Sequence, residues 1–153
     1  KKGLKNFKGV QRRFNYLFEK NQIPFFDDYA HHPTEIESVL DGVKKVYNEE
    51  EIVCIFQPHR ISRVRSLKKE FSKCFKKANT VLLCPIYKAG ENIKLGFSYE
   101  SFAKLIAKNS NVNLIMLKNE YELKKIIKNI TFGKKIFIAM GAGSISNWVR
   151  NLN

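Results

Sequence analysis

Short apolar runs alternate with longer amphipathic segments along most of the chain. Nearly continuous, strand-like runs occur at residues 52–56, 80–84, 112–117 and 136–140. Apolar residues at helical spacing predict helices at 34–47 and 61–78, after the capping residues Ser98 and Asn119, and in a closing segment up to Leu152. Strands that alternate with helices are typical of βαβ units, so the pattern predicts an α/β domain with a mostly parallel sheet.

The N-terminal part departs from this alternation. Residues 9–20 and 22–28 flank Asn21 and carry loosely alternating apolar side chains, which favours an antiparallel hairpin. We therefore expect a sheet of about six strands, antiparallel only at the hairpin, with right-handed crossovers that place helices on both faces. One such domain accounts for all 153 residues.

Polar segments follow four of the expected strands. They are DDYAHH at 27–32, QPHRISR at 57–63, IYKAGE at 86–91 and GAGS at 141–144. Parallel strand order brings the turns after these strands to the same edge of the sheet, and ligands of open α/β sheets bind outside the carboxyl ends of the strands. The sequence therefore predicts one site built from segments that are far apart in the chain.

Two arginines in this set favour binding of an anion. Arg60 and Arg63 are three residues apart and share one face if the helix has begun there. Guanidinium forks bind carboxylate or phosphate, whereas a lysine is only a point charge. The chain is rich in lysine but has arginine at Arg12, Arg13, Arg60, Arg63 and Arg65. The alternative is a solvated helix start, or ion pairs with Asp27 or Glu35.

All three histidines, His31, His32 and His59, fall at expected strand ends. Donation of hydrogen bonds to an anionic substrate, or acid–base chemistry near pH 7, fits this placement. A zinc site that also uses Asp28 is the alternative, but adjacent histidines do not readily point at one ion. We expect no metal site.

The remaining polar residues allow several roles. Asp27 and Asp28 could hold ribose hydroxyls or Mg²⁺, or cap a turn. The N–H groups of residues 141–144 could cradle an anion, or the glycines could permit tight packing. Glu91 could orient a cation. The sequence has no GxxxxGK[ST] loop to hold the phosphates of ATP, so these residues form one half of a site that is completed elsewhere.

Composition and net charge bear on whether the chain binds nucleic acid or a membrane. The net charge of +14 suits nucleic acid or an anionic surface, and a stand-alone basic module that binds nucleotide or nucleic acid is the competing hypothesis. The lysines, however, are scattered over all expected helices and no aromatic-interleaved RNA-binding signature occurs, so we expect no nucleic-acid partner. No apolar run approaches the roughly 20 residues that span a bilayer, so we expect no membrane partner.

Cysteine usage and the chain start suggest the compartment. Cys54, Cys74 and Cys84 lie at apolar positions without zinc-ligand spacing, which favours reduced thiols in a cytoplasmic protein. The first residues, Lys1-Lys2-Gly3, do not resemble a signal peptide. Because the sequence does not begin with methionine, we expect it to be part of a longer protein.

The segments DDYAHHPTE, FQPHRISR and IYKAGE resemble the Mur ligase family of peptidoglycan synthesis. Within the family they are most similar to members that join L-alanine to UDP-N-acetylmuramate. The resemblance extends from GVQRRF at 9–14 to GAG at 141–143. It implies the Rossmann-like C-terminal (third) domain only, without the N-terminal UDP-binding and central ATPase domains, which would be its partners within the same enzyme.

The resemblance also implies a reaction. The muramate carboxylate is activated as an acyl phosphate with ATP, and the amine of L-alanine then attacks. Mg²⁺ is held mainly by the central domain, so the third domain alone is expected to be inactive. A related ligase recycles a whole tripeptide and shares the HHP-type turn, but the QPHR run at 57–60 favours alanine.

Residue roles follow from the matching motifs. For ATP, Arg13 would reach the phosphates and Asp28 would hold the ribose. For L-alanine, the resemblance implies a pocket lined by Tyr29, His31 and His59, with the two histidines as catalytic candidates. Its carboxylate would be gripped by Arg60 and Arg63.

Overall fold

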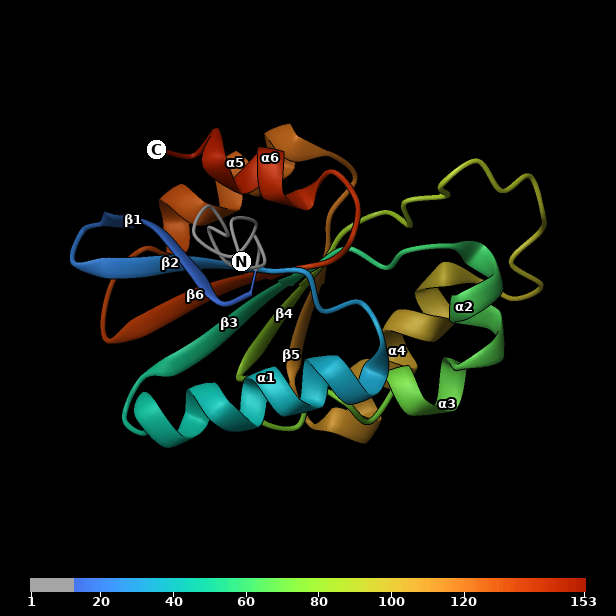
Figure 1. Cartoon of the computed structure of the whole chain (residues 1–153), viewed down its shortest axis with the longest axis horizontal. Coiled ribbons are helices and arrows are strands. Elements are labelled where there is room, and N and C mark those ends of the chain that lie inside the picture. The colour runs from blue at the N-terminus through green and yellow to red at the C-terminus, as the bar shows by residue number, and fades with distance from the viewer. Residues whose placement is uncertain (1–12) are drawn as a thin grey trace, which may run out of the picture.

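The computed structural model describes residues 13–153 (Figure 1). Residues 1–12, with Arg12 and most of the GVQRRF segment, lie outside the described part. The strands are β1 (Asn15–Lys20), β2 (Ile23–Asp28), β3 (Glu51–Phe56), β4 (Thr80–Leu83), β5 (Asn113–Met116) and β6 (Lys135–Met140). The helices are α1 (Pro33–Val46), α2 (Ile61–Ser66), α3 (Lys68–Phe71), α4 (Tyr99–Ser110), α5 (Glu120–Ile130) and α6 (Ile145–Arg150).

The strands form one six-stranded sheet in the order β1-β2-β6-β3-β4-β5. β1 is antiparallel to β2, and every other pairing is parallel. This confirms the predicted mixed sheet with an N-terminal hairpin. The register pairs Asp28 with Met140, Met140 with Phe56, and Phe56 with Leu83. The segments that follow β2, β6, β3 and β4 therefore start side by side at one edge.

Helices cover both faces of the sheet, as the crossover rule predicts. α1, α2, α3 and α4 lie on one face, and α5 and α6 on the other (Figure 1). Successive strand residues point to opposite faces. Phe26 is accordingly buried with α1, whereas Phe25 stacks on Phe137 on the α5–α6 side, with ring centroids 4.5 Å apart. Full burial of such a side chain stabilises the fold by about 1.5–3 kcal/mol.

Three helices begin within one residue of the predicted starts. Pro33 is the first residue of α1, where its missing N–H leaves no bond unmade. Ser98 caps α4 by accepting from the amide of Ser101 at 3.2 Å, and Asn119 caps α5 by accepting from that of Glu122 at 3.0 Å. None of the helices within residues 13–153 is long and apolar enough to cross a bilayer.

The single helix predicted for residues 61–78 is wrong. α2 ends at Ser66, Leu67 leaves helical geometry at φ −114° and ψ 27°, and α3 is one turn long. Hydrogen bonds to α4 replace the helical ones that would follow: Ser110 Oγ donates to the carbonyl of Ser72 at 2.8 Å and accepts from the amide of Phe75 at 3.2 Å. Packing against α4 therefore decides the path of this segment. Phe71, Cys74 and Phe75 are buried, as their helical spacing predicts, whereas Leu67 is only partly buried.

Candidate functional site

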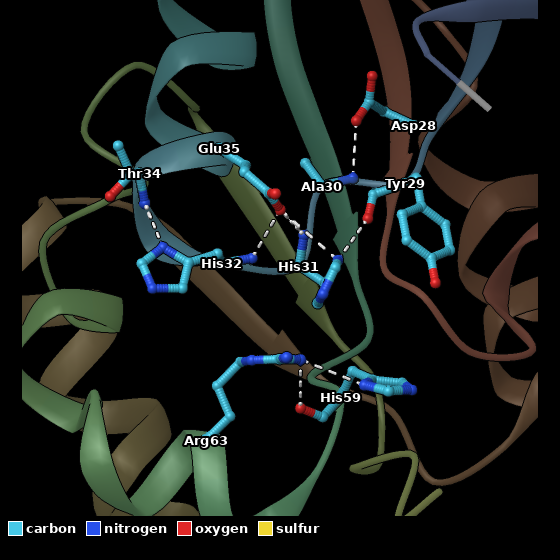
Figure 2. Close-up of polar contacts among 9 residues, drawn as sticks. All are labelled: Asp28, Tyr29, Ala30, His31, His32, Thr34, Glu35, His59 and Arg63. Atoms are coloured by element: carbon cyan, nitrogen blue, oxygen red, sulfur yellow. Dashed lines mark hydrogen bonds and ion pairs between the residues drawn. The ribbon is translucent and has the colours of Figure 1, made fainter. Parts of the chain in front are cut away.

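The turn after β2 is fixed by a carboxylate at the start of α1. Glu35 Oε2 accepts from the amides of His31 at 3.0 Å and His32 at 3.1 Å (Figure 2). With His32 as the N-cap, this forms a capping box. Burial alone would raise the pKa of Glu35, but the two N–H groups outweigh it and lower that pKa. The local sequence thus folds into a rigid turn that presents His31.

The turn after β3 is fixed by the loop that follows β4. The amide of Tyr87 donates to the carbonyl of Pro58 at 2.8 Å, and the amide of Arg60 donates to the carbonyl of Tyr87 at 2.8 Å. Arg60 adopts a left-handed φ of 68° immediately before α2. One turn into the helix, Arg63 Nη1 lies 3.2 Å from both Nδ1 and the carbonyl oxygen of His59.

These turns bring together residues that are far apart in the sequence. The rings of His31 and His59 are in edge contact with centroids 5.6 Å apart, and Tyr29 contacts His31 at 5.0 Å. Figure 2 shows His31 above the His59–Arg63 pair. Arg60 stands beside this cluster with an exposed side chain. The predicted convergence of the DDYAHH and QPHRISR segments at one edge is therefore confirmed.

Hydrogen-bond geometry assigns opposite tautomers to the two histidines. The guanidinium of Arg63 is only a donor, so Nδ1 of His59 accepts and the proton of the neutral ring lies on Nε2. Burial, and then the charge of Arg63, lower the pKa of His59, which keeps it neutral at pH 7. Nδ1 of His31 lies 2.9 Å from the carbonyl oxygen of Tyr29, so it donates, and Nε2 of the neutral ring is basic.

Tyr87 is a site residue that the sequence reasoning did not assign. Its ring stacks on His59 with centroids 5.5 Å apart and an interplanar angle of 13°. A Cβ placed on Gly143 would lie 2.5 Å from the Tyr87 ring and 2.5 Å from Gln57 Oε1. Gln57 Oε1 also accepts from the amide of Ile145 at 3.0 Å. These contacts favour the packing role of the GAG loop over an anion cradle.

A cleft adjoins this cluster on the α1 side and shares Tyr29 with it. It has a volume of about 390 Å³ and is lined by Arg13, Phe14, Asp28, Tyr29, Ala30, Thr34, Glu35, Ser38 and Val39. The carboxylate of Asp28 accepts from the amides of Phe14 and Ala30, each at 2.7 Å. Burial raises the pKa of Asp28 despite these hydrogen bonds. A cation, a carboxylate and an apolar wall in one cleft fit a nucleotide, the role expected of Arg13 and Asp28.

Asp27 does not share this cleft with Asp28. Because the two residues are adjacent in β2, they point to opposite faces. The fully buried Asp27 Oδ2 accepts from Ser146 Oγ at 2.6 Å and lies 3.8 Å from Arg150 Nη2. This carboxylate therefore ties β2 to α6. Joint binding of ribose or Mg²⁺ by Asp27 and Asp28 is incompatible with these positions.

The zinc alternative has no counterpart in the described part of the chain. Within residues 13–153, no three His, Cys, Asp or Glu side chains are grouped closely enough to hold a metal ion. His32 Nδ1 instead accepts from the amide of Thr34 at 3.4 Å as the cap of α1. The three cysteines are buried free thiols, at positions that the sequence predicted to be apolar.

Comparison with known families identifies the class of protein to which the chain belongs. The sequence profile of the family described as "Mur ligase, glutamate ligase domain" matches residues 12–143. The chain therefore belongs to the Mur ligase family, as its C-terminal domain, which confirms the resemblance noted in the sequence.

Individual relatives agree with this assignment. The chain is 64% identical to the UDP-N-acetylmuramate–L-alanine ligase of Pelagibacter ubique, over 99% of this chain and 33% of that protein. It is 39% identical to the ligase of the same name from Brachyspira hyodysenteriae, over 95% of this chain and 31% of that protein. It thus spans about a third of the length of the curated relatives it matches.

Solved structures share the fold. The crystal structure of UDP-N-acetylmuramate-alanine ligase from Thermotoga maritima superposes with a TM-score of 0.71 at 30% identity, and covers 99% of this chain and 31% of that one. A murein peptide ligase from Psychrobacter arcticus gives a TM-score of 0.71 at 22% identity, with 99% of this chain and 31% of that one covered, which shows the fold alone.

Proposed function

We propose that this chain is the amino-acid-binding and ATP-closing domain of an ATP-dependent ligase that joins L-alanine to UDP-N-acetylmuramate in peptidoglycan synthesis. The observation that carries the proposal is the cluster of Tyr29, His31, His59 and Arg63 at one edge of the sheet. The 64% identity to a ligase named for this reaction supports it. The remaining domains of such a ligase would supply the UDP-sugar site and the phosphate-binding loop.

In this proposal, the cluster binds the two ends of L-alanine. The exposed Arg60 and the half-buried Arg63 attract the carboxylate, and charge-assisted hydrogen bonds of this kind are about twice as strong as neutral ones. The Nε2–H of His59 donates to a substrate oxygen. The basic Nε2 of His31 accepts a proton from the ammonium group, which must lose its charge before it attacks a carbonyl.

The cleft beside Asp28 takes ATP. Asp28 accepts from the ribose hydroxyls through lone pairs that its two amide partners leave available, and Arg13 lies close enough in the lining to meet the phosphates. ATP supplies the phosphoryl group that activates the muramate carboxylate. In this proposal, Mg²⁺ is held mainly by the central domain of the complete ligase.

The sharpest test is Arg63→Ala in a complete ligase that contains this domain. Loss of a charged hydrogen bond costs about 1.5–3 kcal/mol, so we expect the KM for L-alanine to rise by about 10- to 100-fold. The KM for ATP should change less than about twofold, because Arg63 does not line the cleft assigned to ATP. Arg65→Ala is the matched control, since Arg65 is exposed and bonds only weakly to the carbonyl of Lys94 at 3.4 Å. Equal increases in both KM values would remove Arg63 from the carboxylate role.

The amino substrate itself needs a separate measurement. The family resemblance also includes a ligase that uses a whole tripeptide, and the murein peptide ligase from Psychrobacter arcticus shares the fold of this chain. We expect the complete enzyme to ligate free L-alanine in preference to a peptide. A higher kcat/KM for tripeptide would contradict the proposal.

A further inference from the structure

The loop between β4 and α4 is fastened to the helix that carries the arginines. Residues 84–98 form neither helix nor strand, and loops of this length in compact domains are usually functional. The loop runs out beyond the end of the sheet, next to α2 (Figure 1). It touches the start of α2 at two points, Tyr87 and Glu91.

The second contact supplies a cap that α2 otherwise lacks. Arg60 occupies the N-cap position without making a side-chain capping bond. Instead, Glu91 Oε2 accepts from the amide of Ser62 at 2.9 Å, and Glu91 Oε1 accepts from the hydroxyl of Ser62. A carboxylate is well placed there, because the first amides of a helix lack intrahelical acceptors and carry partial positive charge.

The two loop contacts also surround Arg60, whose backbone is strained. Arg60 has a φ of 68°, which a bulky residue adopts only when its surroundings hold it there. Tyr87 holds the amide of Arg60 from one side, and Glu91 holds Ser62 two residues further on. The direction in which Arg60 leaves the backbone therefore depends on the loop.

We propose that Glu91 is a positioning residue for the carboxylate-binding arginines: by capping α2 through Ser62, it fixes the backbone of Arg60 and the first turn that carries Arg63. This inference rests on the proposed function. It replaces the cation-orienting role expected of Glu91, because both carboxylate oxygens are engaged by Ser62. The hydrogen bonds from Ser62 also lower the pKa of Glu91, so the cap is ionised at neutral pH.

The test is a kinetic comparison of Glu91→Ala and Glu91→Gln in the complete ligase. We expect Glu91→Ala to raise the KM for L-alanine by about five- to tenfold, as the loss of a helix cap implies. Glu91→Gln should restore part of the affinity, since its amide oxygen still accepts one bond. The KM for ATP should stay within about twofold, because the cleft proposed to take ATP is lined by no residue of α2.

The chain offers a matched control. Glu100 also accepts from a serine at a helix start, with Ser98 Oγ 2.6 Å from its Oε2, but it lies on α4 rather than α2. Glu100→Gln should therefore leave both KM values unchanged. Ser62→Ala, which removes only the hydroxyl bond, serves as the milder variant if Glu91→Ala does not fold, and should raise the KM for alanine by about two- to threefold.

Parallel assays of Arg63→Ala separate this inference from the proposed function. If Arg63→Ala leaves the KM for alanine unchanged, the proposed function itself fails. If Arg63→Ala raises that KM while Glu91→Ala and Ser62→Ala do not, only the positioning role is overturned. A fall in kcat with equal increases in both KM values would also overturn it, because that pattern indicates general loosening of the domain.

Discussion

Nη1 of Arg63 lies 3.2 Å from Nδ1 of His59, one helical turn earlier in the chain. The contact places a permanently charged guanidinium against Nδ1 of His59. The charge state of His59, a candidate substrate-binding residue, therefore depends on the position of Arg63. The same contact fixes the tautomer that exposes an N–H to the cluster.

The titration of His59 should reveal this coupling. We expect NMR titration of the chain to give His59 a pKa below the ordinary value of about 6.5, chiefly because of burial and then because of Arg63. Since the folded-state pKa is lowered, the contribution of His59 to stability is present above about pH 6.5 and is lost as pH falls through the lowered value. Arg63→Met should raise this pKa. A pKa at or above 6.5, or one that Arg63→Met does not move, would contradict the assignment.

Two glycine substitutions should have opposite effects on stability. A Cβ on Gly143 would meet Gln57 and Tyr87 at 2.5 Å, so Gly143→Ala should lower the free energy of unfolding by about 1–3 kcal/mol. A Cβ on Gly42, within α1, would meet nothing within 4 Å, so Gly42→Ala should raise it by about 0.5–1 kcal/mol. Urea denaturation of both variants measures this. Equal effects would mean that the 141–144 loop is not closely packed.

The cysteines should be inert in the folded chain. Burial raises the pKa of Cys84 to about 12 and also raises those of Cys54 and Cys74. Since only the thiolate reacts, a thiol reagent at pH 8 should label none of the three without denaturant and all three in urea. Rapid labelling of the native chain would show that the interior opens far more readily than its packing indicates.

The chain by itself should not turn over substrates. Its sequence has no GxxxxGK[ST] loop, and phosphoryl transfer needs such a cradle for the β- and γ-phosphates. We expect a phosphate-release assay with ATP, L-alanine and UDP-N-acetylmuramate to give no signal above buffer. Substrate-dependent release would show that the half site suffices.

The local pattern, and the parallel strands implied by alternating strands and helices, were enough to predict the mixed sheet, the hairpin and the gathering of His31 with His59, although not the order of the strands. What they could not predict depends on contacts between distant segments. Tyr87 and Gln57 matter because Gly143 lets both approach the loop that precedes α6, and no local sequence spacing indicates this contact. The single helix predicted for residues 61–78 was wrong for the same reason, because Ser110 of α4 forms hydrogen bonds with the backbone of this segment. Asp27 and Asp28 were treated together, although strand alternation separates adjacent residues.

The edge of the sheet at which the parallel strands begin carries none of the candidate site residues. The turn at Asn21, the link at Asn111 and the link at Gly133 precede β2, β5 and β6, so they lie opposite the histidine–arginine cluster. Asn21, Asn111 and Gly133 all have left-handed φ values, between 53° and 74°, typical of tight surface turns. A fluorophore or an immobilisation handle attached to the exposed Asn111 would therefore leave the reacting end unobstructed. Such a label would let movement of this domain be followed while the enzyme works.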